Sequence, residues 1–315
     1  MSWTSHDIPD QAGRVAVITG ANGGLGLEMA RELARKGAHV IMAARNRDKA
    51  QRARLDILRQ IPSASLEVVQ LDLGSLSSTE AAAATIQAVH PRIDILANNA
   101  GVMATPEDRT EDGFELQLGT NHLAHFVFTA RLLPALAATP GSRIVSVTST
   151  ARHTGAPIDP ANPHLRGRYS PWRAYGQSKL ANLHFAVELQ RRLSAAGSQV
   201  LSLVAHPGLS NTDLQAASVR NTGGGASQRF FHVLAQKTGM SPAQGVQPQL
   251  RAATDPKAKG GQLYAPRFVN NGPAVHRPLL GRSVARKPAQ TLWAVSERET
   301  GVSFDVAALV GTASV

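Results

Sequence analysis

Short apolar runs alternate with amphipathic stretches of helical length along the first two thirds of the chain. The apolar runs have the length of buried strands and cover residues 14–19, 38–44, 65–72, 92–99, 143–149 and 200–205. The amphipathic stretches follow residue 25, end near residues 62 and 90, and cover about 112–138 and 172–196. This rhythm is typical of parallel βαβ units.

The pattern weakens in two places. Residues 150–171 contain Pro157, Pro160 and Pro163 among glycines and arginines, so we expect a loop there. After residue 208 the periodicity fades, although QLYA near Gln262 indicates a last strand and a helix is expected after Pro288. No internal repeat is visible.

Together these elements predict an α/β fold in a single domain, a doubly wound parallel sheet of about seven strands with helices on both faces. Within residues 1–315 we expect a core at 14–208 that binds a cofactor and carries the catalytic groups. Residues 209–285 would form a substrate-binding loop and lid region, and 286–315 a C-terminal helix and tail.

Composition narrows the function classes. Of 315 residues, 43% are hydrophobic and none is cysteine, which excludes disulfides, thiolate metal sites and a cysteine nucleophile. The first residues lack a secretory signal, and no run of about 18 apolar residues appears. We therefore expect a cytoplasmic protein without a membrane segment.

The formal net charge is +11, which favours anionic ligands. The basic residues are dispersed and aromatics make up only 4% of the chain, so a nucleic-acid partner is not expected. A phosphate-rich cofactor can use the same field.

A glycine-rich segment, TGANGGLG, covers residues 19–26 directly after the first strand and before a helix. Side chains there would keep a pyrophosphate from the backbone amides and the helix N-terminus. A tight strand-to-helix connection is the alternative reading. No Lys-Ser/Thr pair follows, so this is not a nucleotide-hydrolysing loop. The expected cofactor contacts are Gly20, Asn22, Gly23, Gly24, Leu25 and Gly26.

Arg45 follows the second strand, where NAD-preferring folds place an acidic residue on the ribose 2′-hydroxyl. An arginine suits a 2′-phosphate, so NADP(H) is the expected cofactor and NAD(H) stays open. Arg47 and Lys49 are alternative partners for that phosphate. At the end of the third strand, Asp72 and Leu73 would lie near the adenine, unless Asp72 caps the helix that begins near residue 75.

Tyr175 and Lys179 lie four residues apart on a predicted helix, so both side chains share one face. Lowering a phenol pKa from ~10 to about 7 requires roughly 4 kcal/mol, and a cation at about 4 Å supplies an interaction of that order. Ser149 ends the fifth strand at the edge where open α/β sheets bind ligands. Its hydroxyl can bond a substrate oxygen.

These residues now resemble the short-chain dehydrogenase/reductase family in six motifs that cover about residues 14–208. The motifs are TGANGGLG at 19–26, NNAG at 98–101, Asn121 in TNHLAHF, Ser149 in VSVTST, YGQSK at 175–179 and HPG at 206–208. The long loop after Ser149, SKLAN and LWAVSERETGVSF look most like the retinol dehydrogenase and WW-domain oxidoreductase-like group.

The resemblance implies a Rossmann fold and a catalytic tetrad. Tyr175 would be the acid/base, Lys179 would lower its pKa and bind the nicotinamide ribose, Ser149 would orient the substrate oxygen, and Asn121 would hold a proton-relay water. Asn121 could instead only satisfy buried backbone, and NNAG could mainly shape a turn. Further implied cofactor contacts are Asn98, Ala100, Gly101, Tyr175, Lys179, Pro207, Gly208 and Thr212.

The chain departs from the group's usual pattern at three points: Ser146 stands where Asn is common, Gly119 interrupts a helix, and no hydrophobic anchor precedes the domain. His122 and His125 share a helical face but lack a third ligand at metal spacing, so packing is expected there and no metal site is predicted. His206 is expected to be structural.

The sequence thus predicts an oxidoreductase in which Tyr175 protonates a carbonyl oxygen held by Ser149 while the cofactor supplies the hydride. The expected partner is a small carbonyl or alcohol substrate, and a homo-oligomer stays open. A catalytically silent, dinucleotide-sensing regulator is the alternative. The identity of the substrate depends on residues 150–171 and 209–285, where the glycines at 223–225 favour a mobile lid.

Overall fold

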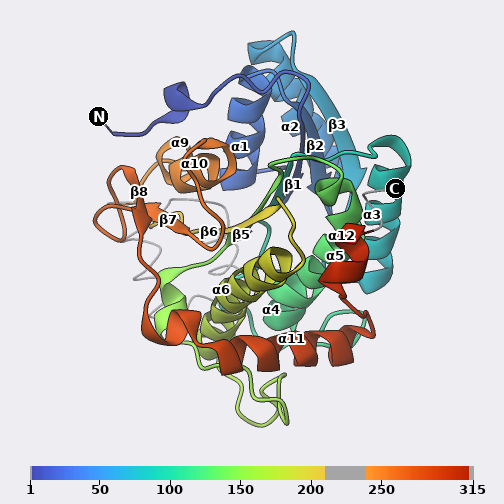
Figure 1. Cartoon of the computed structure of the whole chain (residues 1–315), viewed down its shortest axis with the longest axis vertical. Helices are drawn as coiled ribbons and strands as arrows, with labels where there is room; N and C mark the ends of the chain where they lie inside the picture. The colour runs from blue at the N-terminus through green and yellow to red at the C-terminus, as the bar shows by residue number, and fades with distance from the viewer. Residues whose placement is uncertain (1, 210–238, 312–315) are drawn as a thin grey trace.

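One eight-stranded sheet forms the centre of the protein (Figure 1). A computed structural model describes residues 2–209 and 239–311. The strand order is β3-β2-β1-β4-β5-β6-β7-β8, and all pairs are parallel except β7 with β8. The strands are β1 (Val15–Thr19), β2 (His39–Ala44), β3 (Ser65–Gln70), β4 (Ile95–Asn98), β5 (Arg143–Val147), β6 (Leu201–Ala205), β7 (Leu263–Pro266) and β8 (Ala274–Arg277). The doubly wound α/β prediction is confirmed.

Helices cover both faces of this sheet because its strands alternate their side chains between two cores. In β1, Ala16 and Ile18 pack into one core and Val17 into the other. The first core lies under α1 (Gly24–Arg35), α2 (Arg47–Gln60) and α10 (Gln247–Thr254), and the second under α3 (Leu76–Val89), α5 (Ala124–Ala137) and α6 (Pro171–Ala195). The near-continuous apolar strands follow from burial on both sides.

The eighth strand was not predicted. The sequence indicates one strand near Gln262, and β7 begins at Leu263, but β8 follows it as an antiparallel edge strand. Val275 and Arg277 of this strand are partly buried and His276 is exposed. A four-residue edge strand has neither the apolar run nor the clean alternation on which the prediction depends.

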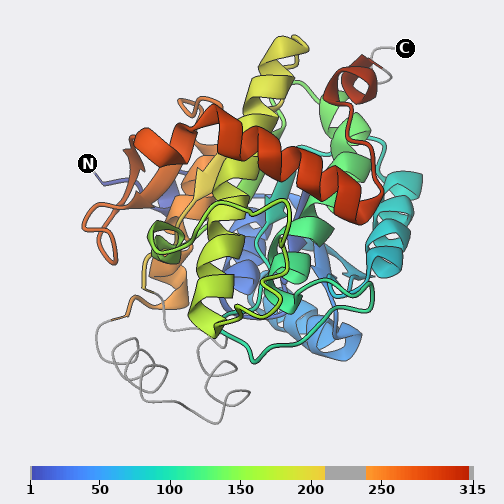
Figure 2. The ribbon, with the colours of Figure 1, turned by 90° about the horizontal axis from the view of Figure 1, so that it is seen from below.

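Two C-terminal helices close one side of the molecule. Helix α11 (Arg286–Thr300) runs across α6, as Figure 2 shows, and α12 (Val306–Gly311) packs beside α5. The Trp293 and Phe304 rings lie 4.9 Å apart between centroids, and Phe126 of α5 meets each of them at 5.2 Å. This aromatic cluster ties the C-terminal segment to the second core, which supports a single domain.

The helix expected from about residue 112 begins later and changes pitch. Glu115 caps α4 (Leu116–Leu118) by accepting from the backbone amides of residues 117 and 118, and Gly113 before it has φ +82°, which excludes a helix. A π-helical turn, η2 (Gly119–Leu123), then leads into α5. The expected interruption at Gly119 is thus a local widening of the helix.

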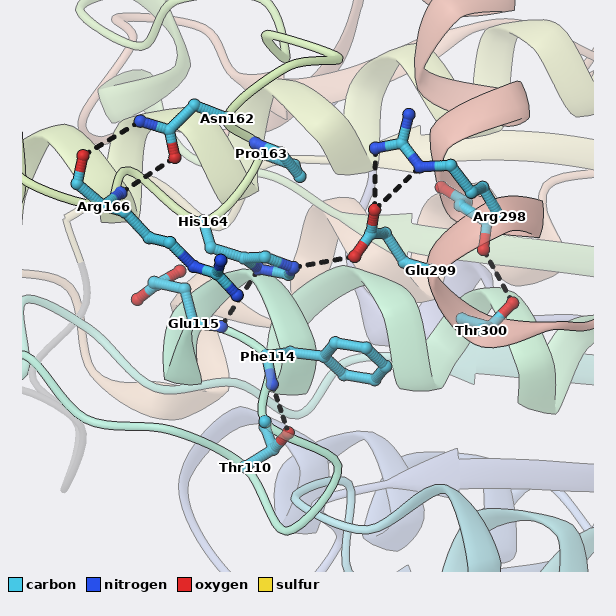
Figure 3. Close-up of polar contacts among 12 residues, drawn as sticks. Thr110, Phe114, Glu115, Asn162, Pro163, His164, Arg166, Arg298, Glu299 and Thr300 are labelled. Atoms are coloured by element: carbon cyan, nitrogen blue, oxygen red, sulfur yellow. Dashed lines mark hydrogen bonds and ion pairs between the residues drawn. The ribbon is translucent and has the colours of Figure 1, made fainter.

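The loop of residues 150–171 has one 3₁₀ turn, η3 (Thr150–His153), and otherwise no regular structure, as the prolines predict. Figure 3 shows how it is fastened: His164 Nδ1 accepts from the Glu115 amide at 3.2 Å, and its Nε2 lies 2.8 Å from a Glu299 carboxylate oxygen. The loop is therefore tied to both α4 and α11.

The remaining short elements are η1 (Ser5–Asp7), α9 (Pro242–Gly245) and η4 (Gly281–Val284). Among residues 2–209 and 239–311, no helix combines the length and apolar character needed to cross a bilayer.

Candidate active site

The predicted site residues gather where β1, β4 and β5 end, at the carboxyl edge of the sheet. The sheet order reverses between β1 and β4, and such a switch point leaves a crevice between the helices that diverge from it. Of the predicted site residues, only Thr212 lies outside the part of the chain that the structure describes.

A cavity of about 230 Å³ lies over the glycine-rich segment, and all six predicted residues of that segment line it. Gly26 cannot carry a side chain, because a Cβ there would lie 2.4 Å from the Gly20 carbonyl oxygen. Gly20 itself has φ +70° and approaches Ala100 closely. Besides Gly20, Asn22, Gly23, Gly24, Leu25 and Gly26, the lining residues are Lys49, Asn99, Ala100 and Gly101.

The turn after β4 is fastened to the end of β1 through Thr19. The Thr19 hydroxyl accepts from the amides of Asn99 at 3.0 Å and Ala100 at 2.9 Å, and the Asn99 side chain donates to the Thr19 carbonyl at 2.9 Å. Thr19 and Asn99 were not predicted as site residues. These bonds hold the cavity wall in place.

Asn98 does not reach the cavity. Its side chain is 2% exposed and its Nδ2 donates to Thr129 on α5 at 2.9 Å. Leu96, two residues earlier, faces the same core, so strand alternation sends Asn98 toward α5 and leaves Asn99 for the cavity. The alternation rule could have found this, and the expected contact of Asn98 is corrected accordingly.

Of the candidates for a 2′-phosphate, Arg45 and Lys49 are both exposed, and only Lys49 lines the cavity. Asp72 accepts from the Gly74 amide at 2.8 Å and does not cap α3, because Ser75 is its N-cap. The Leu73 side chain is buried in the core, so only its backbone is open to a ligand.

Ser149, Tyr175 and Lys179 come together at the end of β5. Ser149 lies close enough to the Tyr175 hydroxyl to lower its pKa. The Lys179 ammonium lies 5.7 Å from the centre of the Tyr175 ring, one turn along α6. Tyr175 is 5% and Lys179 4% exposed, so this corner is nearly dry.

Two glycines allow the segment after Ser149 to pack closely against α6. A Cβ on Gly155 would lie 2.1 Å from the Gly176 carbonyl oxygen, and one on Gly176 would lie 2.8 Å from the Ala151 carbonyl oxygen. The segment that follows Ser149 therefore lies directly on α6, one residue from Tyr175. Gly176 in YGQSK has a packing role that the motif alone does not reveal.

The expected lowering of the Tyr175 pKa is not found. Burial raises the pKa of Tyr175 to about 12, and Ser149 beside the hydroxyl offsets only part of this effect. Desolvation of the phenolate outweighs the attraction of the Lys179 ammonium at this separation. The phenol is therefore protonated at neutral pH.

Burial also lowers the pKa of Lys179 to about 8. Its Nζ donates to the Val147 carbonyl over 3.4 Å, and no carboxylate of residues 2–209 or 239–311 forms an ion pair with it. A buried cation without an anionic partner is costly, which indicates that its partner is a ligand.

Asn121 lies in the π-helical turn, between the two halves of the site. Its Oδ1 accepts from the Val102 amide at 2.7 Å, and its Nδ2 donates to the Val102 carbonyl and to Ser178 Oγ, both at 2.9 Å. A Cβ on Gly101 would lie 2.8 Å from Asn121 Oδ1 and 3.3 Å from Lys179 Nζ. The missing side chain of Gly101, which lines the cavity, thus lets Asn121 and Lys179 approach the cavity wall.

Pro207 and Gly208 follow β6 on the far side of the corner. Gly208 has φ +73°, and a Cβ there would lie 2.6 Å from the Asn270 carbonyl oxygen. His206 beside them is 3% exposed, and burial lowers its pKa to about 3. It belongs to the packed interior, as expected.

Several other histidines are potential metal ligands. His122 Nε2 lies 2.7 Å from Ser296 Oγ, whereas His125 faces Thr19, so the two do not converge. Within the described part of the chain, His39, Glu67 and His90 form the one group of three such residues whose ligand atoms lie close together. They lie at the opposite edge of the sheet, with His90 Nε2 2.8 Å from Glu67 as in a hydrogen bond. The absence of a metal site stays a prediction.

The arrangement fits a dinucleotide. A glycine-rich cradle with no room for a Cβ at Gly26 lies beside a buried ammonium, which has no ion-pair partner among the described residues, and a protonated phenol. The cradle suits a pyrophosphate at the N-terminus of α1, and the ammonium suits ribose hydroxyls.

Known proteins with similar sequences support the same interpretation of the site. The family described as short chain dehydrogenase matches residues 14–223. Mouse polyprenol dehydrogenase is 40% identical over 301 residues, which cover 93% of this chain and 86% of that protein. Mouse retinol dehydrogenase 14 is 36% identical over 302 residues, or 92% of this chain and 86% of that protein.

Solved structures share the fold. A structure of an uncharacterized protein of Mycobacterium paratuberculosis has a TM-score of 0.78 and 42% identity, and covers 96% of this chain and 99% of that chain. A Beutenbergia cavernae protein, assigned as an NAD(P)-dependent gluconate 5-dehydrogenase and solved with bound NADP, has a TM-score of 0.62 and 27% identity over 80% of this chain and 94% of that chain.

Proposed function

Because the chain belongs to the short-chain dehydrogenase family, and is an oxidoreductase similar to polyprenol and retinol dehydrogenases, we propose that it interconverts an alcohol and a carbonyl on an apolar organic substrate with NADP(H). The observation that carries the proposal is the buried corner of Ser149, Tyr175 and Lys179 beside the glycine cradle. When bound, the dinucleotide supplies or accepts the hydride.

In the reduction direction the protein's own groups handle the proton. Tyr175 is protonated at neutral pH and donates its proton to the substrate oxygen, which Ser149 orients from its place beside the phenol. The phenolate that remains is unfavourable in this dry corner. Lys179, whose ammonium lies 5.7 Å from the centre of the Tyr175 ring, would stabilise it once the proton has left.

The cofactor is held at both ends of the crevice. The backbone of residues 20–26 would receive the pyrophosphate, and Lys179 and Asn121 would face the nicotinamide end with Pro207 and Gly208. Asp72, Ala100 and Gly101 would border the nucleoside portions, and Asn99 replaces Asn98 in this set. Thr212 keeps the role that the family resemblance gives it.

NADP(H) preference depends on the cationic side of the adenosine end. Arg45 follows β2 and Lys49 lines the cavity, and no acidic residue stands at the end of β2 to favour a ribose 2′-hydroxyl. The Beutenbergia cavernae neighbour binds NADP, which supports the choice. NAD(H) is the competing cofactor in the test.

An apolar substrate is favoured by the relatives, since polyprenol and retinol dehydrogenases are named for long apolar alcohols. The purified protein should oxidise NADPH with apolar aldehydes such as retinal or a short prenyl aldehyde, and much less with polar keto acids. Loss of the absorbance of the reduced nicotinamide reports turnover.

Two results would contradict the proposal. NADPH binding without turnover on any aldehyde, ketone or alcohol of the panel would favour the dinucleotide-sensing regulator. A preference for polar keto acids would remove the apolar substrate class.

A further inference from the structure

A buried hydrogen-bond chain joins the wall of the cofactor cavity to Asn121. His125 on α5 contacts the Thr19 hydroxyl through Nε2 at 2.9 Å and the Asn121 carbonyl oxygen through Nδ1 at 3.0 Å. The same hydroxyl accepts from the amides of Asn99 and Ala100. One imidazole therefore spans from the end of β1 to the π-helical turn.

The direction of each bond follows from counting protons. A carbonyl oxygen only accepts, so Nδ1 of His125 must carry a proton toward Asn121. The Thr19 oxygen already accepts two amide protons, so its own proton goes to one of two acceptors, Nε2 of His125 at 2.9 Å or the Ala97 carbonyl oxygen at 3.3 Å, of which the imidazole is the nearer. A neutral imidazole with its proton on Nδ1 can make both of these hydrogen bonds, so the contacts select a single tautomer of His125.

The surroundings maintain that neutral form. His125 is 2% exposed, and burial lowers its pKa to about 4, with the charge of Lys179 acting in the same direction. At neutral pH the ring therefore keeps a bare Nε2, which can accept the proton of the Thr19 hydroxyl.

We propose that His125 is a positioning residue that couples the cofactor wall at Thr19, Asn99 and Ala100 to the catalytic corner at Asn121. The proposal rests on the proposed function and deepens it. If the ring is removed, the Thr19 hydroxyl in the wall loses a hydrogen-bond acceptor. The Asn121 carbonyl in the π-helical turn loses a hydrogen-bond donor. Cofactor affinity and turnover should then fall together, although His125 touches neither ligand.

His122 offers a matched control. It lies three residues earlier, is 1% exposed, and bonds Ser296 on α11 at 2.7 Å, away from the cofactor cavity. Replacing either histidine by phenylalanine removes buried polar atoms from the same stretch of helix. Only a specific positioning role makes the two variants differ in cofactor binding.

The experiment compares His125→Phe and His122→Phe by melting temperature, by the NADPH dissociation constant from the fluorescence of bound NADPH, and by kcat at saturating NADPH. We expect His125→Phe to weaken NADPH binding by about tenfold and to lower kcat by a similar factor, as the loss of a buried hydrogen-bond partner predicts. His122→Phe should leave both constants within about twofold.

A second pair covers the case in which His125→Phe does not fold. Thr19→Val removes the hydroxyl and should weaken NADPH binding by about tenfold, whereas Thr19→Ser keeps it and should bind like the wild type. In a folded double variant of His125→Phe and Thr19→Val, the fold-loss of NADPH affinity should be smaller than the product of the two single losses, because both changes remove the same bond.

The binding readout separates this inference from the proposed function. If no carbonyl is turned over but His125→Phe still weakens NADPH binding selectively, the function fails and the coupling stands. Unchanged NADPH binding and kcat in folded His125→Phe, equal losses in His122→Phe, or wild-type binding by Thr19→Val would each overturn the coupling.

Discussion

The two ends of the crevice work by opposite means. At the glycine end, residues 20–26 contribute backbone and empty space, and TGANGGLG contains no ionisable side chain. At the catalytic corner, Tyr175 and Lys179 contribute buried side chains whose pKa values both move away from their usual range. Under the proposed function, cofactor binding would depend on shape at one end and on desolvated charge at the other.

This difference predicts which changes each end tolerates. The glycine end should fail when atoms are added, because there is no room for a Cβ at Gly26. The catalytic corner should fail when polar atoms are removed, even if volume is kept. The following variants separate the two modes of failure.

The largest effect is expected for Lys179→Met, which keeps the length of the side chain and removes the cation. Turnover should fall by about 100-fold or more, while NADPH still binds at the glycine end. The pKa of Lys179 is about 8, so the wild-type rate should decline as the pH rises through that value and the ammonium is lost. A rate profile from about pH 6 to about pH 10 checks this. An identical decline in the variant would contradict the assignment.

Gly26→Ala tests the other end. The added Cβ would lie 2.4 Å from the Gly20 carbonyl oxygen and 2.7 Å from Asn99 Nδ2, so the cradle must shift. Such strain corresponds to about 10- to 100-fold weaker NADPH binding. Gly311→Ala, where nothing lies within 4 Å of the new atom, is the control. Wild-type affinity in folded Gly26→Ala would refute the cradle.

Acid stability should reflect the buried histidines. Burial lowers the pKa values of His122, His125 and His206 to about 3, 4 and 3. Below about pH 6.5 these histidines become protonated in the unfolded chain but stay neutral in the folded one. The free energy of unfolding therefore falls as the pH falls, by up to about 1.4 kcal/mol per pH unit for each histidine. Urea unfolding of His122→Phe between about pH 4 and about pH 6.5 should show a shallower fall. An unchanged slope would argue against a neutral, buried His122.

The smallest effect is expected at the exposed adenosine side. Arg45→Asp should weaken NADPH binding by about fivefold and leave NADH binding nearly unchanged, since exposed charges contribute about 1 kcal/mol. Lys49→Asp is measured in parallel, because Lys49 lines the cavity and Arg45 does not. Equal losses for NADPH and NADH in both variants would remove the 2′-phosphate assignment.

Features that depend on local periodicity can be predicted from the sequence. The βα alternation places the carboxyl ends of β1, β4 and β5 together, and four-residue spacing places Tyr175 and Lys179 on one face of α6. Features that depend on tertiary packing cannot be predicted in this way. The Tyr175 pKa was predicted from one neighbouring charge, whereas burial, which no spacing reveals, determines its direction.

Other differences have equally local reasons. Asn98 was assigned to the cofactor from its motif, but its position in β4 turns it toward Thr129. His125 was read as packing, and only the folded chain brings it to Thr19, 106 residues away in sequence. The edge strand β8 depends on pairing with β7 for its existence, so four residues in isolation do not indicate it.

The central claim, that a buried phenol delivers the proton beside a separately built cofactor cradle, is tested most directly by Tyr175→Phe. The account predicts that this variant binds NADPH with nearly wild-type affinity and loses turnover by about 100-fold or more. Retained turnover, or turnover lost only in proportion to NADPH affinity, would contradict it.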